Sequence, residues 1–415
     1  GRYHMFDGDG MLVGFRFDEG RVSYRNRWIH SRALDAEIRL GRAVYPGLSD
    51  LMNIPSPELV GDAGPFKNPA NTHIVRHAGR YLALYEGGPP TQVTADLDTI
   101  GELTWDGRLE GPMTAHPRID PRTGEMFFFG YQPFPPYIRY HVADAAGDLV
   151  HSTDIDLPAP IMMHDFVITE NYSVFLDSPV CFNLSGDGGE MVRWQPENGC
   201  RLGVLPRMAD GSEIRWFEID PGHVQHFWNA WEDGDRIELS GSRLNHVSFG
   251  MQSGDVDLTE SSAKAEAGRP ARYTIDLAAG PATWEQFDDM GGDFCRFNDD
   301  MAGVKTRYEY MCGFTGREDV MGDFNTIVKY DAVTGAKTEW FPGPNGHVGE
   351  AVFAPDPDGS NEDDGWLLTL VWNDSTDETD LCVIDARDVA AGPVARIHAP
   401  ERVSFGFHVN WFPGA

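Results

Sequence analysis

The sequence Thr326-Ile-Val-Lys-Tyr-Asp-Ala-Val-Thr-Gly-Ala-Lys-Thr-Glu-Trp-Phe341 decides the fold class. Two strand-like runs, Thr326–Tyr330 and Lys337–Phe341, flank a turn that begins at Asp331 and ends at Gly335. The aspartate side chain accepts hydrogen bonds from the turn amides, and the glycine adopts the positive φ that such a turn needs. The stretch therefore predicts a β-hairpin.

The same unit recurs along the chain. Aspartate-to-glycine turns adjoin strand-like runs at Asp18–Gly20, between Leu12–Phe17 and Arg21–Trp28; at Asp120–Gly124, before Glu125–Gly130; and at Asp144–Gly147, between Ile138–Val142 and Leu149–Ile155. Strands spaced by about 8–12 residues, with hardly any helical sequence between them, indicate an all-β protein. Because a sandwich of 415 residues would normally split into domains, the repetition favours a β-propeller.

Little helix and no linker are expected. Ser31–Arg39 begins with an N-cap serine and predicts one short helix. Glu260–Ala267 is either a second helix or a loop, and Asp356–Asp364 is interpreted as an acidic surface loop. No Ser/Gly run or proline-rich spacer divides the chain, so we predict a single domain over residues 1–415. Strand-like sequence begins soon after Gly1, and we expect a native N-terminal segment to be missing.

The composition restricts the partners and the compartment. The formal net charge of −32 argues against a nucleic-acid ligand and against electrostatic attachment to anionic lipid. Five widely spaced cysteines without a Cys-x-x-Cys pair indicate reduced, mostly buried thiols. Neither a signal peptide nor a run of about 18 apolar residues is present in the sequence. We therefore expect a cytoplasmic protein.

Four of the 14 histidines lie in short, mostly apolar contexts near the ends of strand-like runs. They are His116 in Met113-Thr-Ala-His-Pro117, His164 in Met162-Met-His-Asp-Phe166, His226 in Val224-Gln-His-Phe-Trp228 and His408 in Phe405-Gly-Phe-His-Val409. Imidazole is the commonest side-chain ligand for transition metals, and four imidazoles without a thiolate suit ferrous iron with open positions for O2. Because the four are far apart in sequence, only a fold that brings distant strand ends to one axis can assemble them. Nearby histidines that lack this context are His73, His77, His223 and His347.

Three carboxylates in similar contexts are candidates for orienting these imidazoles. A ligating imidazole needs its second N–H accepted by a carboxylate or carbonyl, which fixes the tautomer and the ring angle. Glu86 follows Leu82–Tyr85, Asp293 stands between Gly292 and Phe294, and Glu350 lies in Gly349–Phe353. The alternative for each acid is a turn or surface position.

Longer motifs around these residues resemble one family, the carotenoid cleavage oxygenases. The motifs are Phe6-Asp-Gly-Asp-Gly-Met-Leu12, Ala70-Asn-Thr-His73, Thr114-Ala-His-Pro-Arg-Ile-Asp-Pro121, Met163-His-Asp-Phe-Val-Ile-Thr-Glu-Asn171, His226-Phe-Trp-Asn-Ala-Trp-Glu-Asp233 and Phe405-Gly-Phe-His408. They cover nearly the whole chain in the right order. The resemblance implies a seven-bladed β-propeller with loops and short helices forming a dome over one face and with Fe2+ on its axis.

The resemblance also implies roles for single residues. His116, His164, His226 and His408 would be the iron ligands and the catalytic centre, with Glu86, Asp293 and Glu350 around them. Three carboxylates for four imidazoles would leave one ligand oriented by another group. The family usually has Glu where this chain has Asp293, so we expect the shorter side chain to reach its histidine through a backbone shift or a water molecule.

The implied activity is cleavage of one carbon–carbon double bond of a carotenoid or apocarotenoid with O2, giving two carbonyl products. Candidates for lining an apolar substrate tunnel are Tyr85, Phe134, Tyr137, Met162, Phe227, Trp228 and Trp231. The stilbene-cleaving branch of the family has a lysine near the first outer carboxylate, whereas this chain has Tyr85 and no lysine close by. This favours an apolar polyene, which the protein would extract through peripheral contact with a membrane, although Tyr85 could bind a phenol.

Two other functions stay open at this point. One is a dioxygenase of the same fold that cleaves a stilbene or phenylpropanoid, which a comparison of substrates would distinguish. The other is a non-catalytic or calcium-dependent propeller, such as a lactonase-type hydrolase or a binding scaffold, which metal analysis would distinguish.

Overall fold

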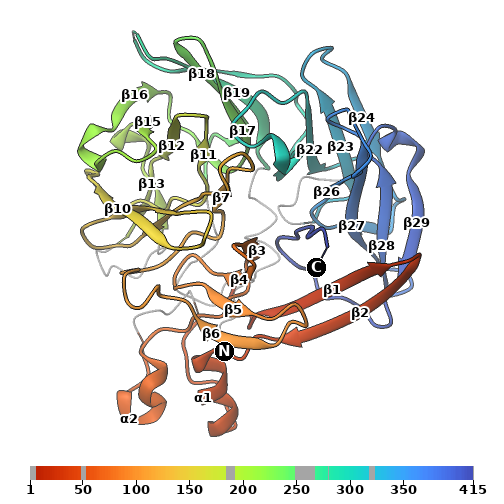
Figure 1. Cartoon of the computed structure of the whole chain (residues 1–415), viewed down its shortest axis with the longest axis horizontal. Coiled ribbons are helices and arrows are strands. Elements are labelled where there is room, and N and C mark those ends of the chain that lie inside the picture. Colours follow the sequence, from red (N-terminus) through yellow and green to blue (C-terminus); the bar gives the residue numbers. More distant parts are fainter. Residues whose placement is uncertain are drawn as a thin grey trace.

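The computed structural model describes residues 6–47, 53–183, 192–247, 267–278, 280–316 and 323–414. Within these residues the β-sheets are arranged as blades around a common centre, and the colours of Figure 1 follow the sequence once around the ring. Figure 1 shows β3, β7, β11 and β17, each the first strand of its blade in sequence, nearest the centre of the ring. The predicted all-β propeller is therefore confirmed.

Six blades contain four or five antiparallel strands each among the described residues. The first two blades consist of β3 (His73–His77), β4 (Arg80–Leu84), β5 (Thr91–Val93) and β6 (Thr99–Glu102), then β7 (Arg118–Ile119), β8 (Met126–Tyr131), β9 (Ile138–Ala143) and β10 (Leu149–Ile155). The third consists of β11 (Val167–Ile168), β12 (Tyr172–Asp177), β15 (Cys200–Pro206) and β16 (Arg215–Ile219), with a side hairpin of β13 (Val180–Phe182) and β14 (Val192–Trp194).

The remaining three blades follow in sequence order around the ring. The fourth consists of β17 (His223–Asp233), β18 (Arg236–Leu244), β19 (Arg269–Asp276) and β20 (Thr283–Gln286), and the fifth of β21 (Gly292–Arg296), β22 (Tyr308–Gly313), β23 (Thr326–Asp331) and β24 (Lys337–Trp340). The sixth consists of β25 (Gly346–Val348), β26 (Val352–Pro355), β27 (Gly365–Asn373), β28 (Glu378–Asp385) and β29 (Pro393–His398).

The prediction of seven blades is wrong. A two-stranded hairpin, β1 (Met11–Asp18) and β2 (Arg21–Trp28), lies between the first and sixth blades instead of a complete blade. Leu12 of β1 and Ile29, which directly follows β2, pack with Ala83 of the first blade, while Phe15 of β1 packs with Leu368 of the sixth. Because the hairpin contacts both neighbours, two strands are enough to cover the exposed flanks of the first and last blades.

Apolar side chains between adjacent blades form the core. Separate buried clusters join the first and second blades, the second and third, the third and fourth, the fourth and fifth, and the fifth and sixth. Aromatic rings dominate the second-to-third contact, where Phe129 of β8 meets Phe166, which directly precedes β11, with ring centroids 5.3 Å apart. Burial of this kind is the main stabilising contribution to a ring of sheets.

The hairpin prediction from residues 326–341 is confirmed. Asp331 Oδ1 accepts hydrogen bonds from the amides of Val333 and Thr334, and Gly335 has a φ of 70°. The loop at 356–364 is also confirmed, although Asp363 is partly buried and pairs with Lys329 Nζ at 2.6 Å. This acidic loop therefore anchors onto the fifth blade rather than lying free on the surface.

Helices are few among the described residues. The predicted helix is α1 (Arg32–Leu40), which begins after Ser31 because the Ser31 hydroxyl accepts the Leu34 N–H, and ends at Gly41 with a φ of 66°. A second helix, α2 (Pro57–Val60), was not predicted, and Glu260–Ala267 lies outside the described residues except for Ala267. Short 3-10 helices occur at η2 (Gly61–Ala63), η3 (Pro196–Asn198), η4 (Gly211–Glu213), η5 (Asp299–Met301) and η6 (Val389–Ala391).

The two α-helices do not cover the centre of the ring. In the view of Figure 1 they project beyond its outline, next to β6. The prediction that short helices form a dome is wrong for α1 and α2, while covering of one face by loops stays a prediction. In the part of the chain that the structure describes, no helix has the length and apolar character to cross a bilayer.

Gly10 provides a test of how the hairpin joins the ring. Its N–H donates to Pro69 O and its carbonyl accepts the Ile29 N–H, and a Cβ at this position would lie only 2.5 Å from Pro69 O. We expect Gly10→Ala to lower the free energy of unfolding by about 1–3 kcal/mol, as overpacking against backbone does. Thermal or urea denaturation measures the loss.

The matched control is Gly14→Ala in the same hairpin. A Cβ there makes an ordinary contact of 3.4 Å with the end of the Leu97 side chain. We expect this variant to keep wild-type stability. Equal stability of the two variants would show that the close approach at Gly10 does not hold the hairpin in place.

Candidate metal centre

Four imidazoles meet at the centre of the ring. Their ligand atoms all lie within 4.8 Å of one another, although the residues come from four parts of the chain. His116 precedes β7, His164 precedes β11 and His226 lies in β17, so three of them stand at the innermost strands of successive blades. His408 follows β29 on the C-terminal segment. The structure therefore brings together all four histidines that the sequence singled out.

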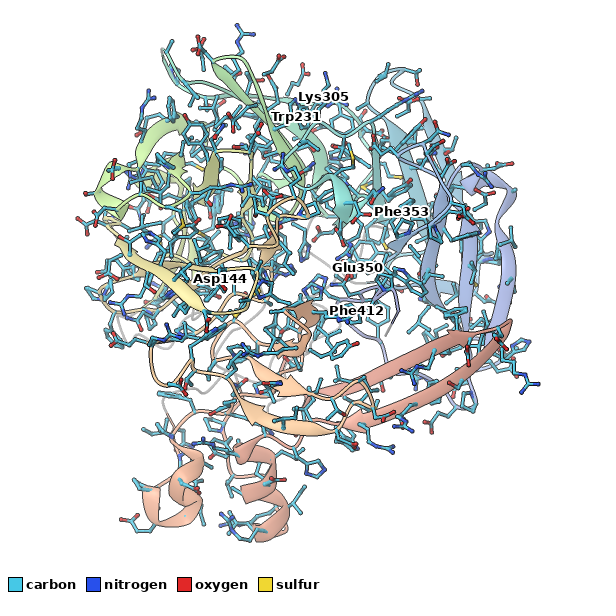
Figure 2. All side chains as sticks on the ribbon, in the orientation of Figure 1. Asp144, Trp231, Lys305, Glu350, Phe353 and Phe412 are labelled. Atoms are coloured by element: carbon cyan, nitrogen blue, oxygen red, sulfur yellow. The ribbon has the colours of Figure 1, made fainter. Side chains whose placement is uncertain are left out.

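Three of the four rings are oriented by the predicted carboxylates. His164 Nδ1 lies 2.7 Å from Glu86 Oε2, His226 Nδ1 lies 2.9 Å from Asp293 Oδ1, and His408 Nδ1 lies 3.0 Å from Glu350 Oε1. In Figure 2 Glu350 lies near the centre of the ring. A carboxylate only accepts hydrogen bonds, so each of these Nδ1 atoms carries the proton and each Nε2 faces the other rings.

This protonation pattern makes the centre suited to a cation. His164 Nε2 lies 2.9 Å from His116 Nε2 and 3.2 Å from His226 Nε2. When His164 and His226 are neutral, their Nε2 atoms face each other as lone pairs, which repel unless a proton or a metal ion lies between them. A metal ion bound by all the Nε2 atoms would satisfy every lone pair at once. The donor set of four imidazole nitrogens thus fits a transition metal.

Burial keeps two of these rings in the neutral state that a ligand requires. It lowers the pKa of His116 and of His408 well below the ordinary value, and the neighbouring imidazoles act in the same direction. Burial also lowers the pKa of His226, but the carboxylates of Asp293, Asp165 and Glu350 together raise it, and the net shift is upward. A proton therefore competes with a metal ion more strongly at His226 than at His116 or His408.

Asp293 reaches His226 without a bridging atom. The register of β21 with β22 shifts between Asp293 and Arg296, and Phe294 has a φ of 56°, which a bulky residue rarely adopts. The direct contact at 2.9 Å needs no bridging water molecule, and the bulge lies directly beside the aspartate. Local strain of this sort is often found at functional sites.

His116, the ring without a carboxylate among the described residues, is positioned through its backbone. The Thr114 hydroxyl accepts the His116 N–H at 3.1 Å and donates to the His164 carbonyl at 3.2 Å. Thr114 is fully buried, so this hydroxyl has no competing water. Thr114 therefore ties the backbone of His116 to the backbone of His164.

His408 is held although no regular strand carries it. Glu350 Oε2 accepts the Val409 N–H at 2.7 Å, so one carboxylate fixes both the His408 ring and the backbone that follows. Thr72 O accepts the His408 N–H at 3.3 Å, and Arg296 donates to Asn410 Oδ1 at 3.3 Å. The C-terminal segment is thereby tied to the first and fifth blades.

Two residues beside the centre were missed by the sequence analysis. The Phe294 ring lies 5.6 Å from the His226 ring and 5.2 Å from the His408 ring, measured between centroids. The His73 ring lies 5.6 Å from His116 and 5.2 Å from His408, and burial lowers its pKa to about 3. His73 Nδ1 lies 2.7 Å from Ala115 O, which holds this ring in place. The only sequence signal for His73 was its place in the Ala70–His73 motif.

Tyr131 is a third residue that was missed. Burial, and next the nearby Glu86 carboxylate, raise the pKa of Tyr131 well above its ordinary value. The tyrosine therefore stays protonated beside the carboxylate that orients His164.

The candidates for substrate contact lie in different environments. Phe227 and Trp228 are buried in the clusters between blades, and Trp228 Nε1 donates to Tyr310 O, so both serve as core. Met162 is buried and Tyr137 packs against the same cluster, Tyr85 is half-buried beside Glu86, and Phe134 is 65% exposed. In Figure 2 Trp231 is well separated from Glu350. Their roles toward a substrate stay predictions.

Comparisons with known proteins agree over the whole length of the chain. Residues 1–413 match the model of the retinal pigment epithelial membrane protein family. A carotenoid 9,10(9',10')-cleavage dioxygenase of Crocus sativus is 36% identical over 98% of this chain and 79% of its own length. An isoeugenol monooxygenase of Pseudomonas nitroreducens is 31% identical over 99% of this chain and 88% of its own length.

A solved structure agrees equally well. The crystal structure of Pseudomonas brassicacearum lignostilbene dioxygenase superposes with a TM-score of 0.89 at 30% identity, over 99% of this chain and 88% of that one. Because the superposition covers 99% of this chain, it includes both the blades and the residues at their centre. It also places proteins named for carotenoid, stilbene and phenylpropanoid chemistry on one fold.

The Asp293–His226 pair generates a prediction about metal affinity. We expect Asp293→Ala to lower the affinity of the centre for Fe2+ or Co2+ by about 10–100-fold, because outer-shell partners of ligating histidines commonly contribute that much. Titration of the metal-free protein with Co2+ measures it. The control is Asp380→Ala, which removes a carboxylate lying 2.6 Å from the exposed His398 ring, away from the centre. Unchanged affinity in Asp293→Ala would contradict the assignment.

Proposed function

This chain belongs to the retinal pigment epithelial membrane protein family of carotenoid cleavage oxygenases, and on that premise we propose that it is a non-haem iron dioxygenase. Its reaction cleaves one carbon–carbon double bond of a carotenoid or apocarotenoid with O2 and gives two carbonyl products. The observation that carries the proposal is the convergence of His116, His164, His226 and His408 on one point.

Iron is the metal that we propose for this centre. The four imidazole nitrogens are suited to a mid-row transition metal, whereas calcium takes six to eight oxygen ligands. A calcium-dependent propeller is therefore disfavoured by the donor set itself. The protein's contribution is to hold Nε2 of each histidine toward the ion through Glu86, Asp293, Glu350 and Thr114.

Iron bound there would supply the redox chemistry that joins O2 to the alkene. The surrounding residues position the reactants and exclude water. The four histidines are buried or nearly so, and Phe294 covers the His226 and His408 rings with an apolar face. No protein acid or base is needed for this reaction, which agrees with the full use of Glu86, Asp293 and Glu350 in orienting histidines.

A carotenoid or apocarotenoid is the substrate that we propose, because the Crocus sativus relative named for carotenoid cleavage is 36% identical over nearly the whole chain. The absence of a lysine near Glu86 in the sequence supports an apolar polyene over a hydroxystilbene. Tyr85, Tyr137 and Met162 are the residues that we propose for contact with it. The relatives named for isoeugenol and lignostilbene support a second candidate, an aromatic alkene whose phenol would bind Tyr85.

The proposal extends to the setting of the enzyme. We propose that the ring acts as one domain in the cytoplasm and meets its apolar substrate at a membrane surface. All five cysteines are buried and unpaired, which supports a reducing compartment.

Identification of the products tests the reaction. Iron-loaded protein is incubated under 18O2 with a panel of apocarotenals and, separately, 4-hydroxystilbenes, and the products are analysed by mass spectrometry. We expect two carbonyl fragments from an apocarotenal, each with one oxygen atom from O2. Cleavage of the stilbenes alone would support the second candidate, and no cleavage of either class would contradict the proposed activity.

His226→Ala tests the ligand assignment directly. This change removes a nitrogen from the metal site, and we expect loss of bound iron and of turnover with the fold retained, as judged by circular dichroism. His151→Ala is the control, because His151 bonds to Ala209 O within blades two and three, outside the centre. Turnover that survived in His226→Ala would show that this histidine is not a ligand.

A further inference from the structure

Asp165, which directly follows His164, accepts hydrogen bonds from three groups in different parts of the chain. Its Oδ1 accepts the Phe166 N–H at 2.8 Å, and its Oδ2 accepts the Phe227 N–H at 2.8 Å and Arg118 Nη2 at 2.6 Å. The side chain is only 1% exposed. Every donor that reaches this carboxylate is therefore a fixed protein group within the buried interior.

Arg118 completes the connection from the opposite direction. Besides its ion pair with Asp165, it donates through Nε to Phe166 O at 2.8 Å, and through its other nitrogens to Phe227 O and Trp228 O, each at 3.3 Å. The guanidinium thus bonds to carbonyls of two segments while the carboxylate bonds to their amides. Such planar, multiple donation is specific to arginine.

Each of these hydrogen-bonded residues closely follows a proposed metal-ligand histidine in sequence. Arg118 is two residues after His116, Asp165 is one residue after His164, and Phe227 is one residue after His226. These segments belong to β7, the start of β11 and β17, which are the innermost strands of the second, third and fourth blades. The apolar contacts between those blades are non-directional and do not define the spacing of three imidazoles to a fraction of an ångström.

We propose that Asp165 and Arg118 form a clamp that fixes the mutual placement of His116, His164 and His226, and so sets the affinity and geometry of the metal centre. The two residues are positioning residues, since neither belongs to the cluster of ligand atoms. The inference rests on the proposed metal centre and adds a separate requirement. Glu86 and Asp293 set the angle of a single ring, whereas the clamp sets the distances between rings.

Asp165→Asn is the sharpest single change. An amide has one accepting oxygen and one donating nitrogen, so either orientation directs an N–H at another donor, Phe166 N or the pair of Arg118 and Phe227 N. Arg118→Lys is the second variant. It keeps a positive charge for Asp165 but cannot bond to the carbonyls of both segments.

A buried ion pair elsewhere in the ring provides the matched control. Asp120 pairs with Arg207 at 2.6 Å, and its side chain is 1% exposed, like that of Asp165. Asp120→Asn therefore removes an equivalent interaction between the second and third blades. Its partners are Arg122 and Arg207, and neither bonds to a residue directly adjacent to a metal-ligand histidine. Arg207 also donates to Thr169 O, which lies beyond the end of β11 that is far from His164.

The experiment titrates the metal-free full chain of each variant with Co2+ alone and records affinity, the visible d–d spectrum and the thermal midpoint. We expect Asp165→Asn and Arg118→Lys to bind Co2+ about tenfold or more weakly than wild type, with an altered spectrum. Asp120→Asn should lose comparable thermal stability while keeping wild-type affinity and spectrum. Where Asp165→Asn does not fold, Arg118→Lys decides.

Two results would overturn the clamp. One is wild-type Co2+ affinity and spectrum in folded Asp165→Asn and Arg118→Lys, and the other is an equal loss of affinity in Asp120→Asn, which would reduce the effect to general stability. Failure of the wild-type chain to bind Co2+ is a distinct outcome, because it would remove the metal centre itself and the clamp with it.

Discussion

Mutual repulsion of imidazole lone pairs is the constraint on which the rest of the structure depends. Carboxylates accept the Nδ1 protons of His164, His226 and His408, so their Nε2 atoms are directed at one another and at His116. In water such lone pairs would be solvated, but here they are buried in the ring. A cation at the point where the Nε2 atoms meet compensates for the repulsion between their lone pairs. The fold must hold the four imidazoles in place before the cation binds.

The propeller meets this demand through its innermost strands. Each blade begins near the centre, so the first strands of blades that are far apart in sequence lie around one axis, and some of their side chains meet there. His408 is the exception, because it follows the last strand of the sixth blade and depends on Glu350, Thr72 and Asn410 for its position. The hairpin β1–β2 matters for the same reason, since it lies between the first and last blades that hold this segment.

Much of the centre could be predicted from the sequence because its ligands have local signatures. A histidine among apolar residues at the end of a strand is costly unless it is bonded, and a carboxylate in a similar context is costly unless it has a donor. Both signals selected residues that the structure brings together. The turns could be predicted for the same local reason, as the Asp331 and Gly335 hairpin shows.

Other features depend on contacts between distant segments and have no local signature. The number of blades follows from which strands pair, and β1–β2 has the same turn chemistry as a blade hairpin while it lacks two further partners. Phe294 and His73 lie beside the ligands only because the blades converge, and the bulge at Asp293 is not visible in its sequence. The placement of Phe227 and Trp228 in the clusters between blades likewise depends on which blades adjoin, and adjacency to His226 in sequence does not reveal it.

X-ray absorption spectroscopy of the iron-loaded protein tests the central claim most directly. The account predicts an iron coordination shell with four imidazole nitrogens, recognised by the outer-shell scattering of their rings. It also predicts no sulfur ligand, because none of the five buried cysteines belongs to the cluster of ligand atoms. A shell with fewer imidazoles, or one containing sulfur or dominated by carboxylate oxygen, would contradict it.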